Sequence, residues 1–338
     1  MTSKRVPWYV AGSLVLPATV LAGRLYTRFR RDIRAAYTRL DMGGSQVIET
    51  ACGRIEYATF GSGYPILVIH GNCGGFDQGI TSARPVLGDG FRAIVPSRFG
   101  YLRTPLPPNA SAPSQADAYA CLLDQLGVDR AAVIGYSAGS TSTIQFALRY
   151  PERVWALVLS SPNAPGKEPA LPPRMVFRLL FGSNFLFWLI TTYFSAGVRT
   201  PMGIPKGYKL TAEDQAAVEE MMRTTLPVAA RAAGVLFDTY VSNPDINSGY
   251  PFERITTPTL VLSAHDDPMA PYENARSLAE RIPGAQLVSL ESGGHLMLGQ
   301  AERTCTAIRS FLQEHATREG ESLHPPDAVG ALSGGIPC

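Results

Sequence analysis

The chain has 338 residues, of which 45% are hydrophobic and 17% are charged. This length allows a sizeable buried core, and this composition excludes a disordered or strongly charged chain. The formal net charge of +2 hides an asymmetry, because residues 1–40 hold eight basic residues and one acid, or +7. The rest of the chain holds 22 basic and 27 acidic residues, or −5. With no basic face on the main body, we expect no nucleic-acid partner.

An uncharged run of 18 residues near the N-terminus, Val6–Gly23, lies between Arg5 and Arg24. A membrane span needs about 17–25 mostly apolar residues, so this run predicts a single N-terminal anchor with a span over about residues 6–23. The arginines that follow at once are typical of an interfacial flank, here up to residue 40. Two alternatives stay open: a cleaved signal peptide and an amphipathic helix that lies on the body.

The charge flanking the run and the cysteines bear on the compartment. The heavier basic flank lies downstream of the run, which favours a cytoplasmic body. The cysteines are odd in number and lack metal-binding spacing, which indicates neither a disulfide framework nor a metal site and agrees with a reducing compartment. They are Cys52, Cys73, Cys121, Cys305 and Cys338.

From about residue 45 to 315, short apolar runs alternate with helical patterns, as is typical of a mainly parallel sheet with crossover helices. The predicted strands are Val47–Glu49, Ile55–Phe60, Ile66–Ile69, Ala93–Val95, Ala132–Ile134, Ala156–Leu159, Thr259–Leu262 and Leu287–Leu290. The predicted helices are Ser114–Leu126, Ala138–Arg149, Tyr272–Arg281 and Glu302–His315. We therefore predict an α/β core over residues 41–162 and 253–316, and a disordered tail over 317–338.

Residues 163–252 interrupt the alternation with prolines and helical patterns but no convincing strand. We predict a helical insertion here, which acts as a lid. Within it, Leu179–Val198 is uncharged, and a buried lid helix explains this better than a second span, which would separate the two halves of the sheet. Its aromatic residues, Phe185 and Trp188 among them, are candidates for lining an apolar substrate pocket.

The sharpest local signal is Gly135-Tyr136-Ser137-Ala138-Gly139, which follows a predicted strand and opens a predicted helix. The pattern G-x-S-x-G places a serine on a tight strand-to-helix turn, where Gly135 and Gly139 let the backbone approach itself. Backbone N–H groups at the following helix N-terminus then point at a developing oxyanion. This placement predicts a nucleophilic serine and argues against an ordinary glycine-rich turn.

A serine nucleophile needs a base, and the chain has five histidines. We expect His315 at a helix end and His324 in the tail, so neither can be held rigidly, while His265 beside two aspartates suits a salt-bridged surface residue. His295 follows a predicted strand and a glycine turn, at the edge of the sheet where ligands bind in open α/β folds. Elimination therefore favours His295, and its carboxylate partner is Asp266 or Asp267, which follow another strand.

Together these segments resemble the α/β-hydrolase superfamily over about residues 45–315. Beside the serine turn, Ile69-His70-Gly71-Asn72 resembles its oxyanion loop, and Ser292-Gly293-Gly294-His295 resembles its histidine loop. Segment 264–271 resembles its acid loop, in which the aspartate stands four residues before a proline. The resemblance implies an eight-stranded sheet with helices on both faces, and the triad Ser137, Asp267 and His295.

By the same resemblance, the backbone N–H groups of Asn72 and Ala138 are the oxyanion donors, and His70 is a structural neighbour of that loop. The helical insertion corresponds to the family's cap, where substrate choice is made. One departure is Cys73, where many relatives carry proline. Serine at position 137 disfavours epoxide hydrolase and dehalogenase activity, for which this fold uses aspartate.

The predicted function is that of a membrane-anchored serine hydrolase of an apolar carboxylic ester, such as a monoacylglycerol, acting through an acyl-enzyme. One alternative is hydrolysis of a diketone C–C bond or an amide, or perhydrolysis, with the same triad. Another is a non-catalytic hydrolase-fold protein that binds a ligand. No metal or organic cofactor is expected, because no ligand cluster or dinucleotide fingerprint is present. Oligomeric state is left open.

Overall fold

A computed structural model describes the backbone of residues 8–167 and 171–323, and the side chains of these ranges except for residues 8–18, 196 and 321–323. Its centre is one eight-stranded sheet with the order β1-β2-β4-β3-β5-β6-β7-β8. The strands are β1 (Gln46–Thr50), β2 (Gly53–Gly61), β3 (Tyr64–Ile69), β4 (Phe91–Pro96), β5 (Ala131–Tyr136), β6 (Val154–Ser160), β7 (Thr259–Ala264) and β8 (Gln286–Leu290).

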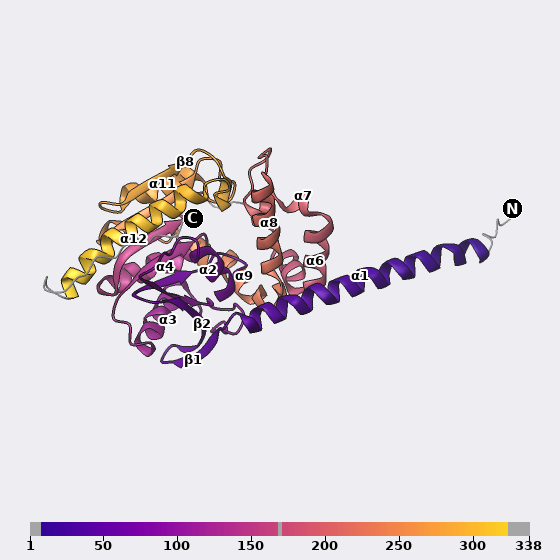
Figure 1. Cartoon of the computed structure of the whole chain (residues 1–338), viewed down its shortest axis with the longest axis horizontal. Coiled ribbons are helices and arrows are strands. Elements are labelled where there is room, and N and C mark those ends of the chain that lie inside the picture. The colour runs from indigo at the N-terminus through magenta and orange to yellow at the C-terminus, as the bar shows by residue number, and fades with distance from the viewer. Residues whose placement is uncertain (1–7, 168–170, 324–338) are drawn as a thin grey trace.

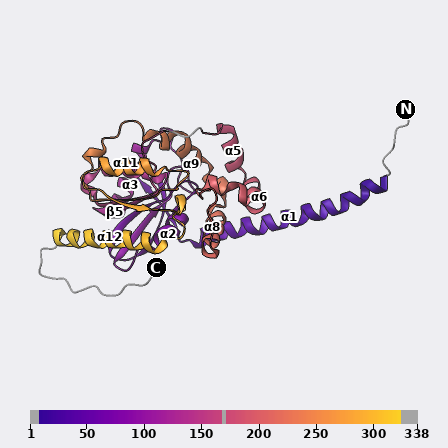
Figure 2. The ribbon, with the colours of Figure 1, turned by 90° about the horizontal axis from the view of Figure 1, so that it is seen from above.

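Strands β1 and β2 form an antiparallel edge, and the remaining strands run parallel to one another. Helices α3 (Ala112–Gln125), α4 (Gly139–Arg149) and α11 (Tyr272–Arg281) contribute to the apolar core on one face. Helices α2 (Phe76–Ala83) and α12 (Ala301–Leu323) contribute to the core on the other (Figure 2). Because both faces are covered, the central parallel strands are mostly apolar, and Val154–Ser160 is buried at every position.

All eight predicted strands are present, with bounds that differ by a few residues. The sequence pattern missed α2, whose eight residues are too few for a clear period. The predicted start of the disordered tail is wrong, because α12 continues to Leu323. An ion pair between Arg130 and the buried carboxylate of Glu319 holds this last part of the helix on the body. Residues 324–338 of the predicted tail lie outside the described residues.

In the helical insertion (residues 163–252), the described residues form helices and turns between β6 and β7 without a strand. The elements are α5 (Arg174–Gly182), α6 (Asn184–Tyr193), α7 (Ser195–Val198), η2 (Thr200–Met202), α8 (Ala212–Thr225), η3 (Val228–Arg231), α9 (Ala232–Phe237), the π-helical turn η4 (Asp238–Ser242) and α10 (Asn243–Asp245). A further turn, η5 (Phe252–Arg254), leads into β7.

The prediction of one lid helix over Leu179–Val198 is wrong. Helix α5 ends at Gly182, and α6 leaves it at an angle of 87°. Ser183 causes the break, because its extended backbone lets its side chain cap the new helix by accepting from Leu186 N–H. Over the part of the chain that the structure describes, no single helix is long and apolar enough to cross a membrane; the bent pair α5–α6 meets that test only jointly.

Helix α1 (Trp8–Met42) is a single long helix that projects from the body (Figure 1). From residue 25 onward, one stripe of this helix packs against α6 and the η3 region. The stripe consists of Leu25, Phe29, Ile33 and Ala36, and its partners include Phe187, Trp188, Leu226 and Val228. The amphipathic helix that lies on the body, one of the predicted alternatives, therefore describes this half of α1. The predicted span over residues 6–23 falls largely on residues whose side chains, or whole placement, lie outside the described part.

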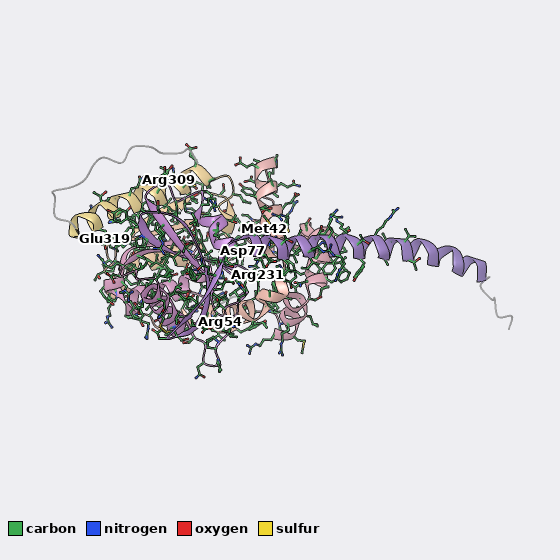
Figure 3. The ribbon with its side chains drawn as sticks, turned by 60° about the horizontal axis from the view of Figure 1, so that its bottom comes forward. Met42, Arg54, Asp77, Arg231, Arg309 and Glu319 are labelled. Atoms are coloured by element: carbon green, nitrogen blue, oxygen red, sulfur yellow. A yellow bond between two sulfur atoms is a disulfide. The ribbon has the colours of Figure 1, made fainter. Side chains whose placement is uncertain are left out.

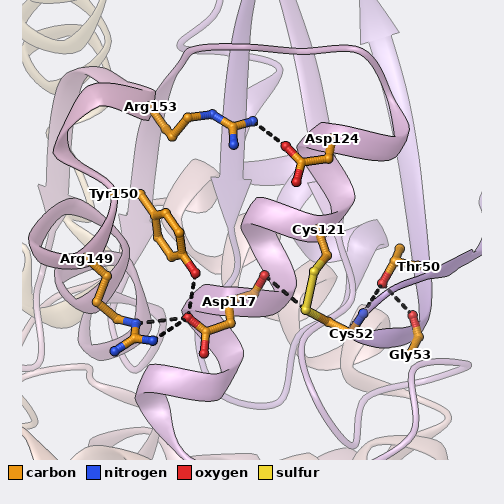
Figure 4. The surroundings of a disulfide bond; sticks show 9 residues. All are labelled: Thr50, Cys52, Gly53, Asp117, Cys121, Asp124, Arg149, Tyr150 and Arg153. Atoms are coloured by element: carbon orange, nitrogen blue, oxygen red, sulfur yellow. Dashed lines mark hydrogen bonds and ion pairs between the residues drawn. A yellow bond between two sulfur atoms is a disulfide. The ribbon is translucent and has the colours of Figure 1, made fainter.

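Cysteines 52 and 121 form a disulfide, which the number and spacing of the cysteines did not predict, since they indicated no disulfide framework. The bond joins the turn between β1 and β2 to α3 (Figure 4). The spacing of 69 residues gave no signal, because only the fold brings the two Cα atoms to 6.0 Å. Cys305 is buried in the core, and Cys338 lies outside the described residues.

Candidate active site

Ser137 lies on the tight turn between β5 and α4 and has a left-handed backbone, with φ of +49°. This conformation is rare for a residue with a side chain and marks functional turns. Both flanking glycines are sterically required. A Cβ at Gly139 would lie 2.5 Å from His70 O, and one at Gly135 would lie 2.7 Å from Thr143 Oγ1. The turn therefore needs the residue types that the sequence pattern singled out.

His295 lies in the loop after β8, and its ring contacts Ser137. Its Nε2 is 2.7 Å from Ser137 Oγ, and its Nδ1 is 2.8 Å from Asp267 Oδ2. A carboxylate only accepts, so Nδ1 carries the proton and Nε2 accepts from the serine hydroxyl. The backbone of His295 is held on both sides: its N–H donates to Gly203 O, and its carbonyl accepts from Ser161 Oγ, each at 2.9 Å. The structure thus brings together the three residues of the predicted triad.

The two neighbouring aspartates have separate partners. The Asp267 side chain is fully buried, and its Oδ1 accepts from the N–H groups of Met269 and Ala270 at 2.8 and 2.9 Å. Its second oxygen is thereby aimed at His295. Asp266 instead accepts from the N–H groups of Gly293 and Gly294, at 3.3 and 2.8 Å. Asp266 therefore holds the backbone of the histidine loop, and Asp267 orients the ring.

The segment His70–Gly75, which we call the His70 loop, lies against the serine turn. A Cβ at Gly71 would be 3.3 Å from Ser137 Cβ. Among the described residues, neither Asn72 N–H nor Ala138 N–H has a hydrogen-bond acceptor. Ala138 precedes the N-terminus of α4, where the helix dipole favours negative charge. Both groups are thus available to a ligand beside Ser137.

His70 is buried and has a structural environment. Burial, together with the Arg98 guanidinium, holds its pKa well below the usual range, so the ring is neutral. Its Nε2 accepts from Arg98 N–H at 3.0 Å, which leaves Nδ1–H to donate to Gly71 O at 2.7 Å. Both ring nitrogens of His70 therefore have a hydrogen-bond partner, and neither of these partners is Ser137.

The structure places the other singled-out residues away from the triad. Trp188 is 2% exposed and donates from Nε1 to Asp32 of α1, and Phe185 packs edge-to-face on Phe29 of α1. The two predicted pocket residues thus contact the N-terminal helix. His265 stacks on Tyr272 at 3.8 Å, and His315 is buried within α12 beside Phe311 and not at a helix end. His324 lies outside the described residues.

Sequence reasoning missed a buried polar network behind the His70 loop, made of Arg98, Tyr101, Asp238 and Arg231. These residues come from two segments about 130–140 positions apart, and no motif links them. A clue could have been the density of polar residues just after β4. Cys73, in the same loop, is partly buried, and burial raises the pKa of its thiol to about 12, so it is no nucleophile at neutral pH.

Comparisons with known proteins identify the family. The family model for the alpha/beta hydrolase fold matches residues 64–301, a range that includes Ser137, Asp267 and His295. The chain belongs to the alpha/beta hydrolase family. An uncharacterised hydrolase from Bacillus subtilis is 31% identical over 280 residues, which cover 77% of this chain and 95% of the relative. The protein is therefore an enzyme, a hydrolase of this fold.

Two further relatives illustrate the range of this hydrolase family. A poly(3-hydroxyalkanoate) depolymerase from Ectopseudomonas oleovorans is 29% identical over 225 residues, which cover 64% of this chain and 72% of the relative. Among solved structures, an alpha/beta hydrolase fold protein from Nakamurella multipartita matches with a TM-score of 0.64 and 28% identity, covering 81% of this chain and 99% of that one. Among the described residues of this hydrolase, no cluster of three His, Cys, Asp or Glu could hold a metal ion.

Proposed function

We propose that this hydrolase cleaves an apolar carboxylic ester with Ser137 as nucleophile, His295 as general base and acid, and Asp267 as the group that orients His295. The observation that carries the proposal is the continuous line of hydrogen bonds Ser137–His295–Asp267, at 2.7 and 2.8 Å. A serine hydroxyl is a weak nucleophile on its own and needs an adjacent base that a third group holds in the right tautomer. The hydrogen bonds of His295 to Ser137 and to Asp267 support both requirements.

In the first half-reaction, Ser137 Oγ attacks the ester carbonyl carbon while its proton passes to His295 Nε2. The tetrahedral intermediate collapses, the bond to the alcohol oxygen breaks, and His295 returns the proton to that oxygen. In the second half-reaction, water attacks the acyl-enzyme as His295 takes its proton, and the carboxylic acid leaves with Ser137 restored. Asp267 stabilises the imidazolium that forms in each step.

The developing oxyanion would be held by the backbone N–H groups of Asn72 and Ala138. Support comes from their lack of an acceptor among the described residues and from the helix that starts at Gly139. Donors fixed in advance where charge develops are worth about 10²–10³ in rate each. The His70 loop lies close enough to Ser137 for this role, since a Cβ added at Gly71 would be 3.3 Å from Ser137 Cβ.

An apolar acyl or alcohol group suits the helical insertion as a cap, the role we propose for residues 163–252. An apolar cluster joins Ile204 and Met222 of this segment to Leu298, which follows the histidine loop, and Met202 packs against it. Gly203 touches His295, since a Cβ there would be 2.3 Å from His295 Cβ. One relative is described as a poly(3-hydroxyalkanoate) depolymerase, which is compatible with an ester substrate.

The test uses purified protein, a fluorophosphonate probe and p-nitrophenyl esters of graded acyl length. We expect labelling and ester hydrolysis in the wild type, and loss of both in Ser137→Ala. Equal labelling of the two proteins would remove Ser137 from the mechanism. Hydrolysis of a vinylogous diketone but of no ester would assign the same triad to C–C bond cleavage instead.

We further propose that the N-terminal part of α1 attaches the enzyme to a membrane. Support comes from the uncharged run Val6–Gly23 and from the arginines that follow it, which suit anionic headgroups. Cell fractionation of the full chain and of a chain lacking residues 1–22 tests this, because the deletion spares the docked stripe of α1. Recovery of the full chain in the soluble fraction would refute the attachment.

A further inference from the structure

The helical insertion contacts the His70 loop through a buried arginine at the glycine end of that loop. Arg231 is fully buried, and its Nη1 donates to Gly74 O at 2.5 Å. The same guanidinium pairs with both carboxylate oxygens of Asp77, at 3.0 and 2.7 Å, and donates to Thr224 O at 3.1 Å. Figure 3 shows Asp77 and Arg231 beside Met42, where α1 joins the body. One arginine thus ties the loop and α2 to the insertion.

A second buried ion pair contacts the other end of the loop. Asp238 of the insertion is fully buried and accepts from Nη1 and Nη2 of Arg98, at 2.6 and 2.5 Å. Arg98 Nη2 also donates to Gly71 O at 3.1 Å, and Arg98 N–H donates to His70. Burial acts to lower the pKa of Arg98, but the Asp238 carboxylate outweighs it and raises that pKa, so the guanidinium stays charged. The loop carbonyl at Gly71 is therefore held by a charged donor that Asp238 fixes in place.

Tyr101 links this pair to Asn72 itself. Its hydroxyl contacts the Asp238 carboxylate and lies 2.9 Å from Asn72 Oδ1. Burial and the Asp238 charge hold the pKa of Tyr101 well above its usual range, so the hydroxyl keeps its proton and shares it between the two acceptors. Asn72 Oδ1 also accepts from Cys73 N–H at 2.8 Å, which folds the side chain back on the loop. The side chain of Asn72 is thereby fixed, and its backbone N–H stays unoccupied.

The insertion is rigidly joined to this network by main-chain contacts. Leu102 N–H donates to Ala230 O at 2.8 Å, and Gly234 N–H donates to Gly100 O at 2.9 Å. A Cβ at Gly234 would lie 2.2 Å from the Tyr101 ring, and one at Gly100 would lie 2.5 Å from Gly234 N, so both glycines are needed for this close approach. Such contact transmits a displacement of the insertion directly to Tyr101 and Arg98.

From these contacts we propose that Asp238 and Arg231 are positioning residues for the oxyanion donor at Asn72, which makes the helical insertion part of the catalytic geometry as well as a lid. The inference rests on the proposed function, in which Asn72 N–H binds the oxyanion. Neither residue touches the reacting atoms. Each acts by holding one end of the His70 loop, and a displacement of about 1 Å at such a donor costs up to about 100-fold in rate.

The chain offers a matched control for Asp238. Asp117, on α3, likewise accepts from an arginine and a tyrosine, Arg149 Nε at 2.9 Å and Tyr150 Oη at 2.7 Å (Figure 4). Its partners are of the same types, but its side chain is 33% exposed, and it lies beside the disulfide, away from the His70 loop. The variants are therefore Asp238→Asn, Arg231→Lys and Tyr101→Phe, with Asp117→Asn as control.

The measurements are kcat and KM for one p-nitrophenyl ester, the inhibition constant of a trifluoromethyl ketone, which forms the tetrahedral oxyanion, and the thermal midpoint. We expect Asp238→Asn and Arg231→Lys to lower kcat about 10- to 100-fold with KM within about twofold, and to weaken the ketone in proportion. Tyr101→Phe removes one hydroxyl and should lower kcat about two- to tenfold. Asp117→Asn should change none of the kinetic constants.

Unchanged kcat and ketone affinity in folded Asp238→Asn and Arg231→Lys would overturn the proposal, as would a loss confined to KM. If either ion-pair variant fails to fold, Tyr101→Phe decides by the same readouts. Failure of the proposed function is a separate outcome: Ser137→Ala would then keep its activity, whatever the insertion variants do.

Discussion

Ser137 combines a left-handed backbone with a position in hydrogen-bond reach of His295. Such a conformation costs about 1–3 kcal/mol, so the surroundings must over-determine it. They do so through backbone bonds on either side: Ser137 N–H donates to Ser160 O at 3.0 Å, and Asn163 N–H donates to Ser137 O at 3.2 Å. The hydroxyl is thereby presented to the histidine by main-chain constraints alone.

The two aspartates of the acid loop make a sharp prediction. Asp267→Asn should lower kcat by about 10⁴, because an amide no longer selects the tautomer in which His295 Nε2 accepts. Asp266→Asn should lower kcat less than about tenfold, because an amide oxygen still accepts one of the two glycine N–H groups. Steady-state kinetics on a p-nitrophenyl ester measures both. Equal losses would mean that the two residues share one role.

His70 makes a prediction about pH. The pKa of His70 in the folded protein lies well below 6.5. Below about pH 6.5, the imidazole is therefore protonated in the unfolded chain while it stays neutral in the folded protein. Stability should therefore fall as pH drops from 6.5, by up to about 1.4 kcal/mol per pH unit for this one group. Urea unfolding at several pH values between 5 and 7.5 measures the slope. In His70→Asn that part of the slope should vanish, and an unchanged slope would contradict the assignment.

Among the individual site residues, those on turns with a recognisable motif could be predicted from the sequence. Ser137 follows from its glycines. His295 follows from the exclusion of His265, His315 and His324, whereas His70 was set aside only through the resemblance to a family. Asp267 was chosen over Asp266 only through the resemblance to a family. The roles of Asp238 and Arg231 could not be predicted. Their partners, Arg98 and Asp77, lie 140 and 154 positions away, and a local sequence pattern does not reveal pairs so far apart.

Among the elements, the parallel strands were predictable because they are buried on both faces, and continuous apolar runs result. The helices of the insertion were not, since a sequence window cannot tell one uncharged helix from two that meet at 87°. The difference rests on Ser183, which accepts from Leu186 N–H and starts a new helix. From the sequence alone, a serine in an apolar run is equally compatible with the cap of a new helix and with the interior of one continuous helix.

The disulfide ties two elements and predicts a loss of stability. Cys52→Ser with Cys121→Ser should lower the free energy of unfolding by about 4 kcal/mol, because the bond closes a loop of 69 residues in the unfolded chain. Denaturant titration with and without dithiothreitol measures this. The reductant should destabilise the wild type by a similar amount and leave the double variant unchanged.

The same bond bears on the compartment. Disulfides persist in oxidising surroundings, so this pair argues against the reducing compartment expected from the cysteine count. Thiol alkylation of the protein in intact cells, followed by mass spectrometry, should find Cys52 and Cys121 protected and joined. Alkylation of both would show that the body is held in a reducing compartment.

For the molecule as a whole, the half of α1 from residue 25 onward is part of the folded unit, because its apolar stripe packs against the helical insertion. Deleting residues 1–40 should lower the free energy of unfolding by about 3–6 kcal/mol, since it uncovers two to three large apolar side chains around Phe187 and Trp188. Deleting residues 1–22 should change it by less than about 0.5 kcal/mol. Denaturant titration of both truncated chains in detergent measures the difference; equal stability would mean that the stripe on α1 contributes nothing.

Helix α1 joins the sheet through a short turn of three residues. It is continuous from Trp8 to Met42, and only residues 43–45 separate it from β1. At 1.5 Å per residue, the part ahead of the docked stripe is a rod of about 25 Å. A dye on its first turn would tumble with the entire molecule, and its anisotropy would decay at the slow rate of a 36.4 kDa particle. A surface or partner that binds this rod would therefore also set the orientation of the active site relative to itself.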